Sequence, residues 1–256
     1  MNLNMKDKTI IVTGGAKGIG AAVAIMASEE GATPVVLDLD EIAGNHLIKQ
    51  LGRGEFIHTD LREEKACKVA VETVVKHYNR IDMLVNNAGI NDLVGLEATN
   101  EAFISSLHTN LIHYFTMTKL CWPHLKAVQG SIVNVASKTA IIGQGGTSGY
   151  IASKGAILAL TKEWAVEGTI HNVRVNAVLP AEVYTPMYES WLMHKYKDKD
   201  KAAEMKQAIE NKIPLGKRMT TPEELAKTVL YLASAMSSHT TGSFLYTDGG
   251  YVHIRS

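Results

Sequence analysis

KTIIVTGGAKGIG, residues 8–20, joins a short apolar run to a glycine-rich turn and the start of a helical pattern. Gly14, Gly18 and Gly20 permit a tight turn and a close approach of the backbone to a pyrophosphate, and the N-terminus of a helix supplies free N–H groups and positive partial charge. A strand before the turn and a helix after it are the context that such a site requires. The stretch therefore predicts a βα unit that binds a dinucleotide.

Short β-rich runs alternate with longer helical patterns along the rest of the chain. Because helices separate consecutive strands, the strands are expected to pair in parallel through right-handed crossovers. The fold class is therefore α/β, a Rossmann-type doubly wound parallel sheet of seven strands with helices on both faces. The strands are expected to begin near Lys8, Pro34, Glu55, Ile81, Gly130, Asn172 and Ser243.

Neither a low-complexity linker nor an internal repeat divides the 256 residues, so a single NAD-binding domain over residues 1–256 is expected. The segment Trp191–Lys212 is charged, has a helical pattern and is inserted between the sixth strand and the final helix. Its position predicts a substrate lid around residues 185–215, although a solvated helix pair would have the same pattern.

The composition argues against several function classes. Lys+Arg and Asp+Glu each count 26, so there is no basic excess to bind nucleic acid or an anionic membrane. Neither a signal peptide nor a run of about 18 apolar residues is present, so a soluble cytoplasmic protein is expected. Cys67 and Cys121 form no CxxC motif and are expected to be reduced structural thiols. The scattered histidines indicate no metal site.

The choice of cofactor depends on the end of the second strand. Asp38 lies there, about 20 residues beyond the glycine turn, where an acidic side chain accepts hydrogen bonds from ribose hydroxyls. A 2′-phosphate at the same place would meet like charge, which favours NAD over NADP. Lys17 in the turn could pair with a 2′-phosphate instead, or be a solvated loop charge.

GYIASKGA, residues 149–156, places Tyr150 and Lys154 one helical turn apart on the same face. A cation beside a phenol favours the phenolate and lowers the pKa of the phenol. Such a tyrosine could exchange a proton near neutral pH, which a free tyrosine does poorly. An ordinary exposed helix pair is the alternative interpretation.

With TGGAKGIG, NNAG at residues 86–89, Asn110, Ser137 and YIASK, the chain resembles the short-chain dehydrogenase/reductase family over nearly its whole length. The resemblance implies hydride transfer at a nicotinamide, with the protein supplying position and proton transfer. Tyr150 would be the catalytic acid/base and Lys154 the cation that lowers its pKa and holds the nicotinamide ribose. Ser137 would bond the reacting oxygen, and Asn110 would seat a relay water.

The resemblance also implies a set of cofactor contacts around the glycine turn and the strand ends. These residues are Gly14, Lys17, Gly18, Ile19, Gly20, Asp38, Asp60, Leu61, Asn87, Ala88, Gly89, Tyr150, Lys154, Pro180, Val183 and Thr185. The family usually reads PGxxxTP after the sixth strand, whereas this chain has PAEVYTP, with Ala181 in place of the glycine.

The loops expected to face the substrate are rich in side chains that form hydrogen bonds, as a polyhydroxylated ligand requires. A steroid or a long acyl chain would need a more apolar wall. Contacts are expected from Asn91, Gln144, Ser148 and Glu182, for which a role as solvated loop residues is the alternative. PAEVYTPMYESW and the terminal GGYVHIRS resemble the L-fucose dehydrogenase branch, whose members oxidise the anomeric hydroxyl of a sugar to a lactone.

Two other functions stay open from the sequence. One is reduction of a ketone by NADP, as in 3-oxoacyl carrier-protein reductases or hydroxysteroid enzymes. The other is a non-catalytic NAD-binding protein, which an intact Ser137, Tyr150 and Lys154 argue against. The resemblance also implies a homotetramer with contacts through the helices that carry Asn110 and Tyr150, where His113 could lie at a contact or in the core.

Overall fold

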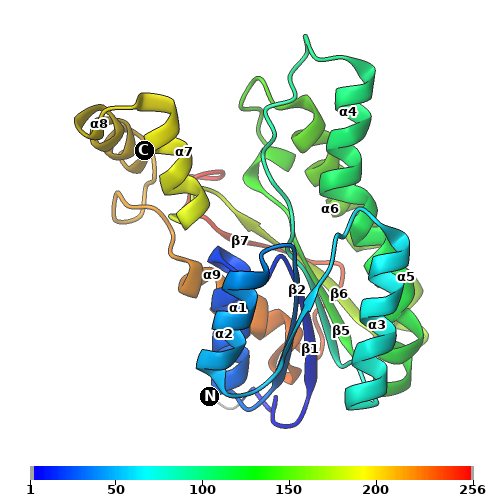
Figure 1. Ribbon diagram of the computed structural model, residues 1–256. Coiled ribbons are helices and arrows are strands. Elements are labelled where there is room, and N and C mark those ends of the chain that lie inside the picture. Colours follow the sequence, from blue (N-terminus) through cyan, green and yellow to red (C-terminus); the bar gives the residue numbers. More distant parts are fainter. Residues whose placement is uncertain (1–2, 255–256) are drawn as a thin grey trace.

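The computed structural model describes residues 3–254, and within them the chain forms one parallel sheet of seven strands flanked by helices (Figure 1). The strand order is β3-β2-β1-β4-β5-β6-β7. The strands are β1 (Thr9–Thr13), β2 (Thr33–Asp38), β3 (Glu55–His58), β4 (Met83–Asn86), β5 (Ser131–Val135), β6 (Arg174–Pro180) and β7 (Phe244–Thr247). Each begins within two residues of its predicted start, and the doubly wound fold class is confirmed.

The central strands are apolar on both faces because helices cover both sides of the sheet. In β1, Ile10 and Val12 pack toward one helical layer, whereas Ile11 between them packs toward the other. The first layer contains α1 (Gly18–Glu29), α2 (Glu41–Leu51) and α9 (Pro222–Ala233). The second contains α3 (Glu64–Tyr78), α5 (His113–Val128) and α6 (Ser148–Thr169). Cys67 and Cys121 lie in the core of this second layer as free thiols.

Buried amides join the strands to the helix that carries Tyr150. Asn86 Nδ2 donates to Asn134 Oδ1 at 3.0 Å, and Asn134 Nδ2 donates to Thr161 Oγ1 at 2.9 Å. Buried polar groups that are paired in this way fix one arrangement of their elements, since breaking a pair leaves a desolvated group without a partner. These two hydrogen bonds thereby fix the position of α6 relative to the carboxyl ends of β4 and β5.

Two sets of helices lie beyond the carboxyl ends of the strands (Figure 1). On one side is α4 (Asn100–Leu107), which continues through a π-helical turn (His108–Ile112) into α5. On the other side are α7 (Pro186–Tyr196) and α8 (Lys199–Glu210), so the segment from 191 to 212 forms the helix pair that its sequence pattern predicts. Among residues 3–254, no helix has both the length and the apolar character needed to span a membrane.

Candidate functional site

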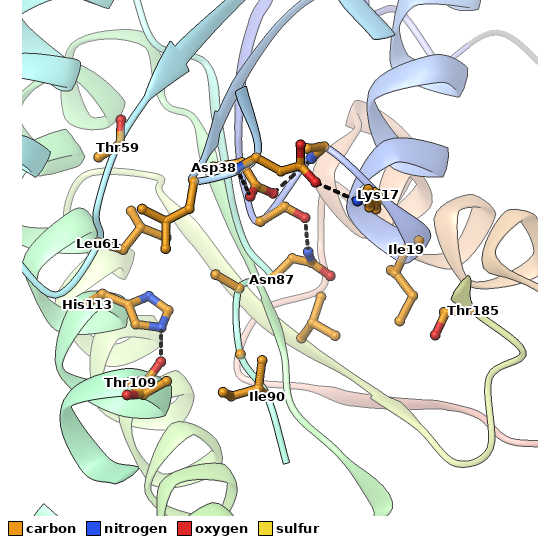
Figure 2. A pocket seen from close by; sticks show the side chains of 18 of the residues that line it. Lys17, Ile19, Asp38, Thr59, Leu61, Asn87, Ile90, Thr109, His113 and Thr185 are labelled. Carbon is orange, nitrogen blue, oxygen red and sulfur yellow. Dashed lines mark hydrogen bonds and ion pairs between the residues drawn. The ribbon is translucent and has the colours of Figure 1, made fainter. Parts of the chain in front are cut away.

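A cavity of about 730 Å³ opens at the carboxyl ends of the strands (Figure 2). Its floor lies between β1 and β4, where the strand order reverses and the crossovers turn to opposite faces of the sheet. Parallel α/β sheets bind their ligands at this switch point, because the loops diverge there and leave a crevice. The volume lies within the range of small-molecule sites.

The glycine turn forms one wall of the cavity, and its packing requires the glycines. Gly14 and Gly18 have φ values of +62° and +58°, and a Cβ on Gly14 would lie 2.8 Å from Ala88 Cα. A Cβ on Gly20 would lie 2.3 Å from the Gly14 carbonyl oxygen. In the described part of the chain, no side chain caps the N-terminus of α1 beside this wall. The free N–H groups suit an anionic group such as a pyrophosphate.

A threonine that the sequence analysis missed joins the glycine turn to the NNAG turn. Thr13 Oγ1 accepts hydrogen bonds from the backbone N–H groups of Asn87, at 2.9 Å, and Ala88, at 3.2 Å. Asn87 Nδ2 in turn donates to the carbonyl oxygens of Thr13 and Gly14, at 3.0 and 2.9 Å. The Asn87 side-chain amide therefore stabilises the glycine turn, and Asn87 also lines the cavity. A hydroxyl residue directly before the glycines is the signal that could have predicted this bond.

Asp38 and Lys17 lie together at the end of β2, with a second carboxylate that the sequence analysis also missed. Asp38 Oδ2 accepts from the Ala16 N–H, and its Oδ1 accepts from the Asp40 N–H, each at 3.0 Å. Lys17 Nζ lies 2.5 Å from Asp40 Oδ2 (Figure 2). This contact raises the pKa of Lys17 and lowers that of Asp40. The loop cation is therefore already paired, and two carboxylates face one ammonium.

Lys154 is buried, with 2% of its surface exposed, and its ammonium is held by oxygens from two other elements. Nζ donates to the Val135 carbonyl oxygen at 2.8 Å and to Tyr114 Oη at 3.1 Å. Burial lowers the pKa of Lys154 to about 7, because these dipoles do not replace the lost hydration. Nζ also lies 5.6 Å from the centre of the Tyr150 ring.

Lys154 is not among the groups that lower the pKa of Tyr150 in this structure. Burial raises the pKa of the Tyr150 phenol to about 12, a hydrogen bond with Ser137 opposes the rise, and the carboxylates of Asp92 and Glu182 add to it. The hydrogen bonds of the Lys154 ammonium go to the Val135 carbonyl and the Tyr114 hydroxyl. The phenol therefore keeps its proton at neutral pH.

Asn110 lies in the π-helical turn and is fully buried. Its Oδ1 accepts from the Ile90 N–H at 2.8 Å, and its Nδ2 donates to the Ser106 carbonyl oxygen at 3.2 Å. The extra residue in a π turn re-aims a side chain relative to the surrounding helix. Asn110 thereby fixes the loop that follows NNAG, close to Asp92 Oδ2, which lies 3.5 Å from Asn110 Nδ2.

Most of the expected cofactor contacts lie on the walls of this one cavity. Those on the walls are Gly14, Lys17, Gly18, Ile19, Asp38, Asp60, Leu61, Asn87, Ala88, Gly89, Tyr150, Lys154, Pro180 and Thr185. Gly20 packs under the turn, and the side chain of Val183 is in the core, so only its backbone remains available. The expected substrate contacts Asn91 and Gln144 are exposed and lie off these walls, because their loops bend outward to solvent. Ser148 is half-buried in the first turn of α6.

Glu182, an expected substrate contact, forms an ion pair with Lys138. The two side chains are 7% and 16% exposed, for Lys138 and Glu182 respectively. The Lys138 ammonium also lies over the Tyr251 ring, 4.0 Å from its centre. A hydrogen bond links Glu182 to Tyr188, and burial with this carboxylate raises the pKa of Tyr188. The pair joins the loop after Ser137 to the start of α7 and to the C-terminal segment.

These walls fit a dinucleotide in three respects. The uncapped helix N-terminus suits a pyrophosphate, Asp38 suits ribose hydroxyls, and Lys154 offers N–H donors beside Tyr150. A metal ion has no comparable site, since no three His, Cys, Asp or Glu side chains gather to hold one anywhere in residues 3–254.

Comparisons with known proteins agree with this geometry. The family model described as enoyl-(acyl carrier protein) reductase matches residues 14–252. The 3-oxoacyl-(acyl-carrier-protein) reductase FabG of Thermotoga maritima is 37% identical, covering 98% of this chain and 100% of its own. The L-fucose dehydrogenase of Bos taurus is 33% identical, covering 98% of this chain and 91% of its own. The crystal structure of Cj0485 dehydrogenase has a TM-score of 0.94 and 43% identity, covering 100% of this chain and 98% of that one.

Replacing Asp92 by Asn should lower the pKa of Tyr150. The Asp92 carboxylate disfavours the phenolate, so removing its charge should let the phenol ionise at lower pH. The pKa is measured from the ultraviolet absorbance of the phenolate during a pH titration, as the difference between each protein and its Tyr150→Phe counterpart. Glu97→Gln removes an exposed carboxylate from the same loop and should leave the titration unchanged. An equal shift in both variants would contradict the assignment.

Proposed function

This chain belongs to the short-chain dehydrogenase/reductase family, and from that premise we propose that it oxidises the anomeric hydroxyl of an aldose, L-fucose or a related sugar, to the lactone with NAD. Family membership makes it an NAD(P)-dependent oxidoreductase acting on CH–OH groups. The observation that carries the sugar proposal is the set of charged and polar groups around the Tyr150 hydroxyl.

Those groups include hydrogen-bond acceptors that a ligand with several hydroxyls could satisfy. The carboxylates of Asp92 and Glu182 both act electrostatically on Tyr150, so they lie near its hydroxyl. Asp92 Oδ1 is buried and has no hydrogen-bond partner within the described residues. A buried acceptor without a donor costs about 1–3 kcal/mol, which sugar hydroxyls would recover and an acyl chain or a steroid would not.

The residues would divide the reaction between proton transfer and positioning. Bound NAD supplies the nicotinamide that accepts a hydride from the anomeric carbon. The ionised Tyr150 takes the proton of the anomeric hydroxyl, Ser137 donates a hydrogen bond to the same oxygen, and the carbon–oxygen bond becomes a carbonyl. Because the phenol has a pKa of about 12, ionisation limits oxidation and the rate should rise with pH.

Two features of the surrounding structure complete the proposal. Helices α7 and α8 would act as the lid over residues 185–215, since Thr185 and Pro186 at the base of α7 line the cavity. A homotetramer would use α5, α6 and β7, because large apolar side chains are exposed on each. These are Phe115, Val166, Ile170 and Leu245.

Reduction of a 3-oxoacyl thioester or another ketone is the second candidate. It is favoured by the 37% identity to an acyl-carrier-protein reductase and by the protonated phenol, which is the form that donates a proton to a carbonyl oxygen. Preference for NADP and turnover of ketones, with no turnover of aldoses, would support this candidate instead.

An aldose panel tests the main proposal. Purified protein with NAD should form NADH with L-fucose or a related aldose, and Tyr150→Phe should lower kcat by about a hundredfold or more, since the proton acceptor is lost. Tyr231→Phe, the same change at an exposed site on α9, should leave kcat unchanged. NADH absorbance measures both. Silence across the panel, with active ketone reduction, would refute the sugar proposal.

The carboxylates at the end of β2 should make the protein prefer NAD. A 2′-phosphate would meet Asp38 and Asp40, and the Lys17 ammonium is already paired with Asp40, so NADP should bind at least about tenfold more weakly. Asp40→Ser should narrow that gap by freeing Lys17. Glu41→Gln, one position further and exposed, should not. Titration calorimetry measures both affinities, and tighter binding of NADP by the unaltered protein would contradict the prediction.

Lys138 should act as a positioning residue for Glu182. Lys138→Met leaves the carboxylate half-desolvated and unpaired, so KM for the sugar should rise about tenfold while the affinity for NAD is unchanged. Lys138→Arg keeps the charge and should recover most of the loss. A purely structural role would instead lower thermal stability and kcat without a selective rise in KM.

A further inference from the structure

His113 is a buried side chain of the cavity wall that has one ring nitrogen without a partner. It begins α5, is 1% exposed and contributes to the lining of the cavity. Nε2 lies 3.1 Å from the Thr109 carbonyl oxygen. Because a carbonyl oxygen only accepts, Nε2 carries the ring proton, and Nδ1 is an acceptor. Within the described residues, Nδ1 has no hydrogen-bond partner.

The ring stays neutral at physiological pH, which keeps Nδ1 an acceptor. Burial lowers the pKa of His113 to about 4, the charge of Lys154 lowers it further, and only the bond to Thr109 opposes the shift. A neutral imidazole held in one tautomer has a single fixed acceptor. An N–H or O–H group of a bound ligand could satisfy this buried nitrogen.

The position of His113 identifies which part of a dinucleotide could reach it. Thr59, Leu61 and His113 line the same cavity, and Figure 2 shows them on the side opposite Ile19 and Thr185. The order β1, β2, β3 leads outward from the glycine turn, so a ribose at Asp38 directs its base over the end of β3. The wall there is made by Leu61 after β3 and by His113 across from it.

Asp60, a second hydrogen-bond acceptor at this end of the cavity, already accepts hydrogen bonds from Arg62. Arg62 donates to Asp60 Oδ1 through Nε at 2.9 Å and to Oδ2 through Nη2 at 2.6 Å, and its backbone N–H also bonds Oδ1. This contact lowers the pKa of Asp60. His113 is therefore the buried acceptor at this end that still lacks a donor in the part of the chain that the structure describes.

We propose that Nδ1 of His113 accepts a hydrogen bond from the exocyclic amino group of adenine, and so makes this protein selective for a 6-amino purine in its dinucleotide. The proposal rests on the use of NAD proposed above. A 6-oxo purine would set a carbonyl oxygen against the Nδ1 lone pair. Moving the ring proton to Nδ1 would relieve that contact only by breaking the bond to Thr109.

The test compares binding of NAD with binding of nicotinamide hypoxanthine dinucleotide, which differs in the 6-amino group. Calorimetry on the full chain needs no substrate. The unaltered protein should bind NAD about tenfold more tightly than the analogue, the size expected when one buried group loses its partner. His113→Gln places its amide near the position of Nε2 and lacks an acceptor at Nδ1, so it should bind NAD about tenfold more weakly and no longer distinguish the two.

Two further variants distinguish a hydrogen bond between His113 and the adenine from a purely structural role of His113. The amide of His113→Asn lies near the position of Nδ1, and this variant should recover most of the affinity for NAD. His46→Gln makes the same change as the main variant on the exposed surface of α2 and should alter neither affinity. Equal binding of both dinucleotides by the unaltered protein, or unchanged discrimination in His113→Gln, would overturn the proposal while NAD use stands. Failure to bind NAD at all would overturn both.

Discussion

The buried ammonium of Lys154 is the constraint around which the reacting end of the cavity is arranged. It joins β5, α5 and α6, since the Val135 carbonyl and the Tyr114 hydroxyl hold a group carried by α6. No carboxylate contacts Nζ in the described structure, so dipoles alone compensate the charge and the pKa of Lys154 falls to about 7. Oxygen atoms of a bound ligand beside Nζ would stabilise the charged form.

The same desolvation acts on Tyr150 with the opposite charge. A buried phenolate would lie near the carboxylates of Asp92 and Glu182, so the neutral phenol is the stable form. A protonated phenol beside a weakly basic lysine is suited to donate a proton, and the reverse direction needs the phenol to ionise first. A ligand that donates hydrogen bonds to these carboxylates would weaken their repulsion of the phenolate and favour its formation.

The sequence predicts the fold well because its signals are local. Each strand is a short apolar run, and each helix begins after a turn signal, so the order of elements follows directly from the chain. The cofactor wall is predicted for the same reason, since residues at strand ends such as Asp38 meet wherever parallel strands end together. The partners of those residues are not predicted in this way. Asp40, Thr13 and Lys138 are recognised only when side-chain contacts between distant segments are known.

The substrate end is predicted less completely from the sequence, for a related physical reason. Asn91 and Gln144 lie on loops whose direction no periodic pattern fixes, and both point to solvent. Glu182 remains a predicted substrate contact, and its ion pair with Lys138 could not be predicted because the two residues lie far apart in the sequence. The residues at the strand ends are positioned by the parallel sheet, whereas Asn91, Gln144 and Glu182 lie on connecting segments whose direction the sheet does not fix.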